Sequence, residues 1–179
     1  MKKRVIIVCT DLRFLRLFLY QHLHELKKSS DLYIIASDNY GEVKYFSDFD
    51  VKIINISRKM SLIKDVLALL RILTILLRIR PQKVISIMPK AGLLSAISSF
   101  LLRVPDRLHI FTGQVWVTEK LIWKKAILSI CDKVIAKLST QILTDGHTQS
   151  KFLVRAGIVP HSKVSTPRYG SIAGVSLTD

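Results

Sequence analysis

Short apolar runs alternate along this chain with longer segments in which apolar residues recur at helical spacing. Residues 5–9 form a continuous, largely β-branched run, which is the pattern of a strand covered on both faces. The same reasoning predicts strands at residues 5–9, 32–36, 51–56, 84–88, 108–112, 141–143 and 164–166. It predicts helices at residues 12–28, 61–79, 91–102, 121–138 and 148–156.

The regular alternation of strands and helices predicts an α/β fold. We expect a Rossmann-like, doubly wound and mainly parallel sheet, with helices on both faces and right-handed crossovers. The length of 179 residues suits one domain, which we assign to residues 1–168. Residues 169–179 are rich in small residues and carry no packing pattern, so we expect them to form the edge of that domain.

The predicted helix at residues 61–79 is apolar on most sides. Lys64, Arg71 and Arg78 are spaced by seven and form a single basic stripe. Two interpretations remain open: a central helix with one solvated stripe, or a helix that lies on anionic lipid. Its uninterrupted apolar run falls well short of the about 20 residues that cross a bilayer, which disfavours a transmembrane helix.

The predicted helix at residues 121–138 has two different parts. Its later turns place Ile127, Ile130 and Ile135 on one arc and Asp132 and Lys133 on the other, as a core-facing amphipathic helix does. At its start, tryptophan lies among basic residues, a composition favoured at membrane interfaces. We therefore expect peripheral contact with an anionic membrane through Lys120, Trp123, Lys124 and Lys125.

The charge of the chain is strongly basic and unevenly placed. The formal net charge is +15, and residues 51–179 hold 20 Lys/Arg against 6 Asp/Glu. Such a surface attracts polyanions, anionic lipid or phosphorylated substrates, and charge alone does not choose among them. The two cysteines, Cys9 and Cys131, lie in apolar surroundings and are interpreted as small buried residues of a cytoplasmic protein.

Candidate ligand loops follow three of the predicted strands. Parallel α/β proteins bind ligands at the carboxyl ends of their strands. Two loops there have a polar, glycine-containing character and suggest one cleft, lined by Pro89, Lys90, Gly92, Thr112, Gly113 and Gln114. A third loop contains Asp145 and His147. Two interpretations remain open: His147 is an acid or base able to titrate near neutrality, or the loop is a helix N-terminus capped by Asp145 or Thr148.

Several classes of site are disfavoured by the motifs that the chain lacks. The loop after the first strand, Thr10-Asp11-Leu12-Arg13, has no glycine for a dinucleotide fingerprint, and a solvated face explains Arg13 and Arg16 better than an anion site does. The sequence has no P-loop, no nucleophile elbow and no zinc pattern, so we expect no metal and no cofactor. Nucleic-acid modules find no support beyond the charge.

Four sequence blocks together resemble a known family. They are Met88 to Leu94, His109 to Trp116, Gln149 to Leu153, and Gly170 to Val175. In order and spacing they are similar to the N-terminal half of bacterial family 4, GT-B type glycosyltransferases of capsular, exopolysaccharide or O-antigen synthesis. The resemblance covers nearly the whole chain.

The resemblance implies a two-domain enzyme that retains anomeric configuration and needs no metal. Its N-terminal half binds the acceptor, often a lipid-linked saccharide at the inner face of the plasma membrane, and its C-terminal half binds the nucleotide-sugar co-substrate. Pro89, Lys90, Gly92, Thr112, Gly113, Gln114 and His147 would then contact the acceptor. Gly170, Ser171 and Gly174 would lie near the donor phosphates, at a crossover beginning at residue 169.

The chain also departs from the family pattern. Thr112 and Gly113 occupy the place of a histidine found in some relatives, and His109 lies too early in the strand to replace it, so no catalytic residue is assigned. The family continues for another ~150 to 200 residues, a second domain by ordinary size. We therefore expect the donor domain to be absent here or supplied by another subunit, and the chain to be inactive alone. The alternative function is a non-catalytic basic α/β module that binds a partner protein or a polyanion.

Overall fold

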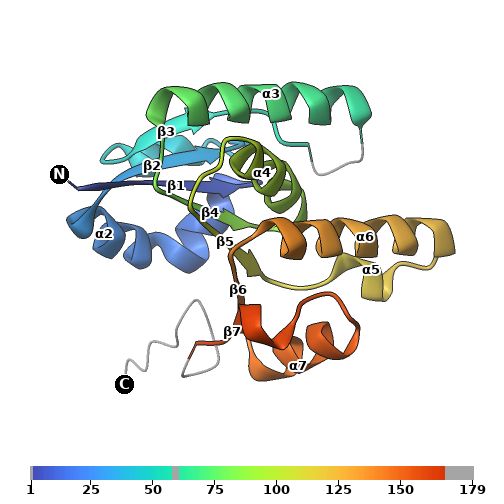
Figure 1. Cartoon of the computed structure of the whole chain (residues 1–179). Helices are drawn as coiled ribbons and strands as arrows, with labels where there is room; N and C mark the ends of the chain where they lie inside the picture. The colour runs from blue at the N-terminus through green and yellow to red at the C-terminus, as the bar shows by residue number, and fades with distance from the viewer. Residues whose placement is uncertain (1, 58–60, 168–179) are drawn as a thin grey trace, which may run out of the picture.

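A computed structural model describes residues 2–57 and 61–167. A seven-stranded sheet forms its centre in the order β3-β2-β1-β4-β5-β6-β7, and each neighbouring pair is parallel (Figure 1). The strands are β1 (Lys3–Cys9), β2 (Ser30–Ala36), β3 (Asp50–Ile53), β4 (Lys83–Ile87), β5 (Asp106–Phe111), β6 (Gln141–Thr144) and β7 (Val164–Ser165). The predicted Rossmann-like fold class is confirmed.

Helices cover both faces of this sheet. The helical segments are α1 (Leu12–Phe14), the π-helical η1 (Leu15–Leu19), α2 (Tyr20–Ser29), the 3₁₀-helical η2 (Glu42–Phe46), α3 (Leu62–Ile79), α4 (Pro89–Leu101), α5 (Val115–Thr118), α6 (Ile122–Leu138), α7 (His147–Arg155) and the 3₁₀-helical η3 (His161–Lys163). Segments α1, η1 and α2 pack on one face. Helices α3, α4 and α6 lie on the other, and the starts of α3 and α6 point toward the same end of the molecule (Figure 1).

The continuous apolar run of β1 fills both layers. Ile7 and Cys9 pack with Leu15 of η1, whereas Ile6 and Val8 pack with Ile72 of α3 and its neighbours. Side chains alternate between the faces of a strand, so a strand buried on both sides needs an apolar residue at every position. The strand order reverses between β1 and β4, which places the carboxyl-end loops of the sheet at the switch point where such folds bind ligands.

The differences from the expected elements are local. The helix expected at residues 12–28 runs to Ser29 but contains the π-helical turn of η1 in its middle. The polar connector after β2 folds into η2, which follows Gly41 at φ +68°. The short α5 was not predicted, because four residues are too few to display helical periodicity.

The prediction of the buried face of α6 was wrong in part. Asp132, expected on the solvated side, is only 3% exposed, whereas Ile130, expected in the core, is 57% exposed. The cause is Trp116 of α5, whose indole nitrogen donates a hydrogen bond to the Asp132 carboxylate. A tertiary partner therefore rotates the buried face of α6 away from the most apolar arc. Cys131 is only half-buried, whereas Cys9 is buried.

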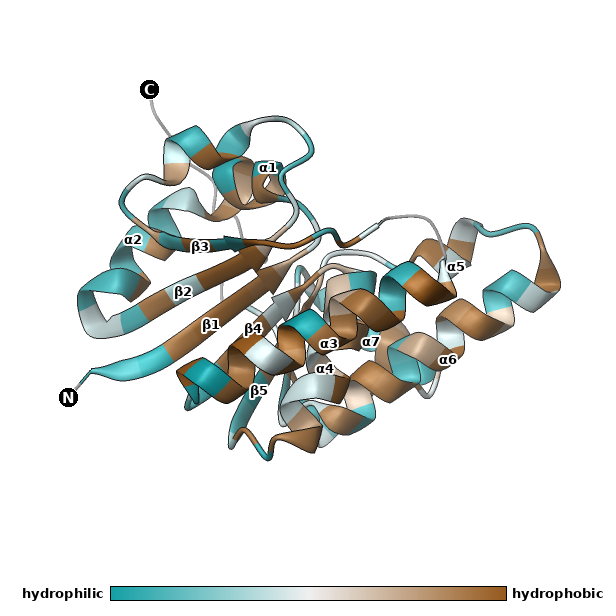
Figure 2. Cartoon of the chain, turned by 90° about the horizontal axis from the view of Figure 1, so that it is seen from above, coloured by the Kyte–Doolittle hydropathy of each residue, from teal (hydrophilic) through white to brown (hydrophobic). Residues whose placement is uncertain are grey.

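Helix α3 exposes apolar side chains on its outward side, whose hydrophobic positions Figure 2 shows from above. Ile72 and Leu76 face the core, but Leu62 is 82% and Ile63 76% exposed, and Leu67, Leu70 and Leu77 are each more than half exposed. The interpretation of a central helix with a single solvated stripe is therefore wrong for the outer face. In the part of the chain that the structure describes, no helix combines the length and the hydropathy needed to cross a bilayer.

Candidate functional site: a groove at the carboxyl edge of the sheet

An open groove follows the carboxyl ends of β5 and β6. Its volume is about 660 Å³. The loop after β5 supplies one wall and the start of α7 supplies the other, with lining residues Thr112, Gly113, Gln114, Val117, Thr118, Asp145, Gly146, Thr148, Gln149 and Phe152. Among these described lining residues Asp145 is charged, and there is no lysine, arginine or histidine. In a chain with 28 Lys/Arg, the groove is nevertheless lined by threonine and glutamine side chains together with glycines and apolar side chains.

The loop after β5 turns sharply into this groove. Ile110 and Phe111 end the strand in the core, and Gly113 then takes φ +143°, a backbone conformation that residues with a Cβ rarely adopt. Val115 to Thr118 form α5, whose only buried side chain is Trp116. The wall thus consists of a turn at Gly113 followed by one helical turn, which the buried Trp116 holds against the core.

Two amides connect the walls. Gln149 Nε2 donates to Gln114 Oε1 over 3.4 Å, and Gln149 Oε1 accepts the backbone N–H of Asp145 over 2.8 Å. Gln114 Nε2 is buried and has no hydrogen-bond partner in the described part of the chain. The register that pairs Phe111 with Thr144 brings these loops together, although the two glutamines lie 35 positions apart.

Phe152 provides the aromatic surface of the groove. One side of its ring stacks on Trp116, with centroids 5.5 Å apart and an interplanar angle of 29°. The residue remains 37% exposed and lines the groove. An aromatic ring beside amides and hydroxyls suits a ligand that is polar at its edge and apolar on its face, as a sugar ring is.

A smaller apolar hollow of about 200 Å³ adjoins the groove. Its lining is formed by Phe14, Phe18, Leu19, Ile87, Ile110, Thr112 and Asp145. Thr112 and Asp145 belong to both linings, so the two hollows are contiguous. A ligand lying across them meets neutral polar groups on one side and hydrocarbon on the other.

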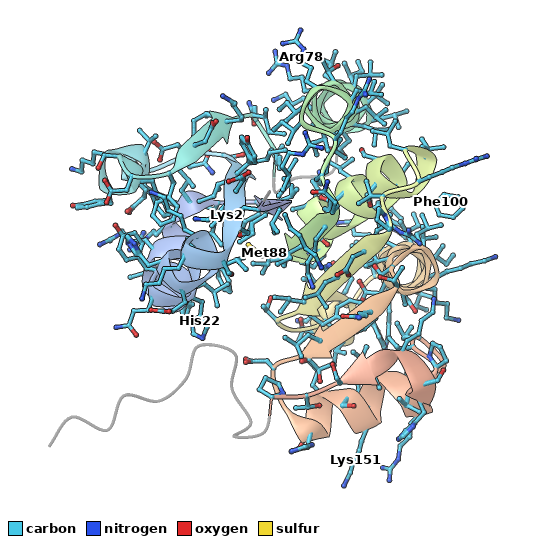
Figure 3. The ribbon with its side chains drawn as sticks, turned by 60° about the vertical axis from the view of Figure 1, so that its left-hand side comes forward. Lys2, His22, Arg78, Met88, Phe100 and Lys151 are labelled. Carbon is cyan, nitrogen blue, oxygen red and sulfur yellow. The ribbon has the colours of Figure 1, made fainter. Side chains whose placement is uncertain are left out.

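The second predicted loop lies outside the lining of the groove. Pro89 is the first residue of α4 and follows Met88, whose φ of +73° is unusual for a residue other than glycine. Figure 3 shows the Met88 side chain inside the molecule. Lys90 reaches toward α3, where its Nζ lies 2.8 Å from Asp65 Oδ1. The Lys90 ammonium, which was expected to contact the acceptor, is therefore held in an ion pair.

Gly92 has a packing role in the structure. It is buried in α4 against the ring of His109, and a Cβ at this position would lie 2.4 Å from His109 Cε1. His109 is itself inaccessible, with Nδ1 2.9 Å from Ser86 Oγ, and burial lowers the pKa of His109 to about 3. His109 is thus a neutral core residue near pH 7.

His147 and the arginines of the first helix are placed differently from the groove. His147 is the exposed first residue of α7, and the lining of the groove contains its neighbours Gly146 and Thr148 instead. Gly146, and neither Asp145 nor Thr148, occupies the N-cap position of α7. Arg16 pairs with the buried Glu42, and the Arg13 guanidinium lies over the Tyr40 ring.

The predicted membrane residues gather at the start of α6. Trp123 is 57% exposed, its neighbour Ile122 is 85% exposed, and the Lys124 ammonium lies 5.4 Å from the centre of the Trp123 ring. Lys120 and Lys125 are also exposed. These residues thus form a solvent-facing apolar and basic cluster. Gly170, Ser171 and Gly174, proposed at the donor phosphates, lie outside the described residues.

Sequence reasoning missed three features of the site: the glutamine pair, the exposed face of Phe152 and the buried Asp132. The contacts of all three depend on long-range pairing that periodicity does not reveal. Within residues 2–57 and 61–167, no three histidine, cysteine, aspartate or glutamate residues lie close enough together to hold a metal ion.

Comparison with known proteins places this geometry in context. No protein-family model matches the chain. The chain is 26% identical over 151 residues to the capsular polysaccharide biosynthesis glycosyltransferase CapM of Staphylococcus aureus, a match covering 84% of this chain and 39% of CapM. The chain therefore spans about two fifths of the length of this curated relative.

Solved structures share the fold. The UDP-GlcNAc 2-epimerase of Methanocaldococcus jannaschii superposes with a TM-score of 0.66 at 18% identity, covering 93% of this chain and 45% of that one. HepE of Anabaena, solved with UDP and glucose, gives 0.70 at 8% identity, covering 92% and 43%. The fold is that of one Rossmann-like domain of a GT-B type protein, and the sequence is similar to a glycosyltransferase of capsule synthesis.

Proposed function

We propose that this domain is the acceptor-binding part of a retaining glycosyltransferase in surface polysaccharide synthesis. The enzyme would move a sugar from a nucleotide-sugar to a lipid-linked saccharide. The observation that carries the proposal is the groove, in which Phe152 and the amides of Gln114 and Gln149 face a space large enough for a saccharide. The similarity to CapM supports the same class of reaction.

The division of labour follows from the chemistry of the lining. A nucleotide-sugar carries a diphosphate, which proteins bind with basic side chains or backbone N–H groups. Among the described lining residues of the groove there is no basic side chain, so we assign the groove to the saccharide of the acceptor. Since the chain spans 39% of CapM, we assign donor binding to a domain outside residues 2–167.

The apolar hollow beside the groove suits the same ligand. Phe14, Phe18 and Ile110 would receive an apolar part of the acceptor, while Thr112 at the junction would face the sugar. In this arrangement the domain binds and orients the acceptor hydroxyl. The activated sugar would approach from the donor domain, at the carboxyl edge of the sheet.

Calorimetric titration tests the assignment. We expect the chain to bind a short-chain lipid-linked saccharide and to bind a UDP-sugar at least tenfold more weakly. Tight binding of the nucleotide-sugar without binding of the acceptor would overturn the assignment of the domain. Affinity for arbitrary DNA that falls steeply with salt, with no response to either sugar ligand, would favour the basic-module alternative.

We further propose that this domain contacts the inner face of the plasma membrane. Trp123, Lys124 and Lys125 lie in the first turn of α6 and Lys120 lies just before it, and the exposed Leu62 and Ile63 lie in the first turn of α3 at the same end of the molecule (Figure 1). An apolar cluster edged by lysines is complementary to a bilayer rich in anionic lipid. Bound in this way, the domain would hold its acceptor groove near the lipid anchor of the substrate.

Vesicle flotation tests the membrane contact. Each lysine near an anionic surface contributes about 1 kcal/mol, so replacing Lys120, Lys124 and Lys125 by glutamine should weaken binding roughly a hundredfold. A matched control replaces the exposed lysines Lys133, Lys137 and Lys151, which removes the same charge away from the start of α6. Equal losses in the two variants would mean that net charge, and not this cluster, attracts the lipid.

A further inference from the structure

Trp116 connects a buried acid to both walls of the groove. Its indole Nε1 donates to Asp132 Oδ2 over 2.7 Å, and its ring stacks on Phe152. Trp116 also lies in α5, whose residues Val117 and Thr118 line the groove. A displacement of this one side chain would therefore move the loop after β5 and the aromatic surface of α7 together.

Burial of the Asp132 carboxylate costs free energy, so a purely structural role explains this residue poorly. It is 3% exposed, and a carboxylate buried in this way is destabilised by loss of water. Burial raises the pKa of Asp132 to about 6, although the hydrogen bond from Trp116 opposes this shift. An asparagine could accept the same hydrogen bond without the cost of burying a charge. The acid supplies a stronger, charge-assisted bond to the indole.

The ionisable groups around Asp132 are few. Helix α5 carries none, and the neighbouring Cys131 of α6 has a thiol pKa raised by burial and by the charge of Asp132. Lys90 of α4 is paired with Asp65. Helices α6 and α7 also carry the exposed Lys133, His147, Lys151 and Arg155. Histidine is the residue type most often used as a switch near neutral pH, so a test must separate Asp132 from His147.

We propose that Asp132 is a positioning residue, whose carboxylate fixes Trp116 and through it sets Phe152 and the β5–α5 loop for saccharide binding. The inference rests on the proposed saccharide groove. When Asp132 takes up a proton, the bond to the indole loses its charge assistance, and the buried carboxyl hydrogen needs an acceptor of its own. Trp116 is then held less firmly, and the groove binds saccharide more weakly.

The first measurement needs no saccharide. The chain has two tryptophans, so Trp123→Phe leaves Trp116 as the only tryptophan whose emission is observed. We expect this emission to titrate with a midpoint near pH 6, the pKa of Asp132, and to lose that transition in Asp132→Asn. Near-ultraviolet circular dichroism at pH 5 serves as the control for folding of both variants. A transition that persists in Asp132→Asn overturns the link between the two side chains.

The second measurement follows the saccharide dissociation constant from pH 7.5 to pH 5. In the wild type we expect it to rise roughly three- to tenfold as Asp132 is protonated. Asp132→Asn should show the weaker value at every pH. His147→Gln should retain the wild-type profile, and loss of the profile in His147→Gln with retention in Asp132→Asn would overturn the proposal. If no saccharide binds, the proposed function fails, while the emission titration still decides the role of Asp132.

Discussion

Replacement of Gly92 by alanine tests the packing behind the site. Gly92 is buried within α4, and a Cβ there would lie 2.4 Å from His109 Cε1 and 2.8 Å from His109 Nδ1. Carbon atoms in contact are most stable about 3.5–4.0 Å apart, so the imidazole would have to move by roughly 1 Å. No space is open to it without cost, because His109 is fully buried and its Nδ1 lies 2.9 Å from Ser86 Oγ.

The magnitude follows from three contributions. Overpacking of a core typically costs about 1–3 kcal/mol, and weakening the contact between Ser86 and His109 costs about 1 kcal/mol more. Alanine returns about 1 kcal/mol, because it favours a helix more than glycine does. The net loss of about 1–3 kcal/mol should lower the Tm by roughly 2–12 °C in a domain of this size.

Thermal and urea unfolding of Gly92→Ala, His109→Ala and the double variant provide the assay. His109→Ala removes the ring, so adding Gly92→Ala to it should be neutral or stabilising by up to about 1 kcal/mol. The effect of one substitution thus reverses in sign with the presence of the other side chain. A Gly92→Ala variant as stable as the wild type would refute the close approach of α4 and His109.

Two further substitutions address stability and the groove. In Asp132→Asn, the stability of the fold should lose a pH dependence. Burial raises the pKa of Asp132 from its ordinary 3.8 to about 6, so the wild type loses up to about 3 kcal/mol of stability as pH rises from 3.8 to 6. Calorimetry from about pH 4 to 7.5 should find no such decline in the variant. Gly113→Ala should cost about 1–3 kcal/mol through backbone strain at φ +143°, since its Cβ would meet no atom within 4 Å, and unchanged stability in urea would contradict that strain.

The regular part of the fold could be predicted from the sequence. Strands such as β1 are continuous apolar runs, and α3 and α6 are long enough to display helical spacing. Their order specifies the α/β class through general rules of connection. Local signals therefore sufficed wherever one physical pattern dominated a segment.

The burial of α6 could not be predicted in the same way. Helical periodicity assigns a charged residue to the solvent side, yet Asp132 is buried because Trp116 offers it an indole N–H. That partner lies 16 positions earlier, in a helix of four residues that no periodicity predicts. For α3 the sequence left two interpretations open, because apolar residues lie on most sides of the helix and are ordinarily counted toward the core.

The candidate site was predicted in part. Thr112, Gly113 and Gln114 line the groove, because they follow a strand whose carboxyl end is set by the topology. Lys90 does not, since its ammonium pairs with Asp65 of α3, a contact over 25 positions that sequence spacing does not indicate. Contacts between distant side chains therefore decide which of the residues that follow a strand also line the groove.

A saccharide titration followed by nuclear magnetic resonance tests the central claim most directly. We expect the largest shift changes at Gln114, Gln149 and Phe152, and Phe152→Ala should weaken binding at least tenfold. Phe100→Ala is the matched control, because Phe100 is 49% exposed and projects from the end of α4 (Figure 3). Perturbations confined to other surfaces, or equal losses of affinity in Phe152→Ala and Phe100→Ala, would contradict saccharide binding in the groove.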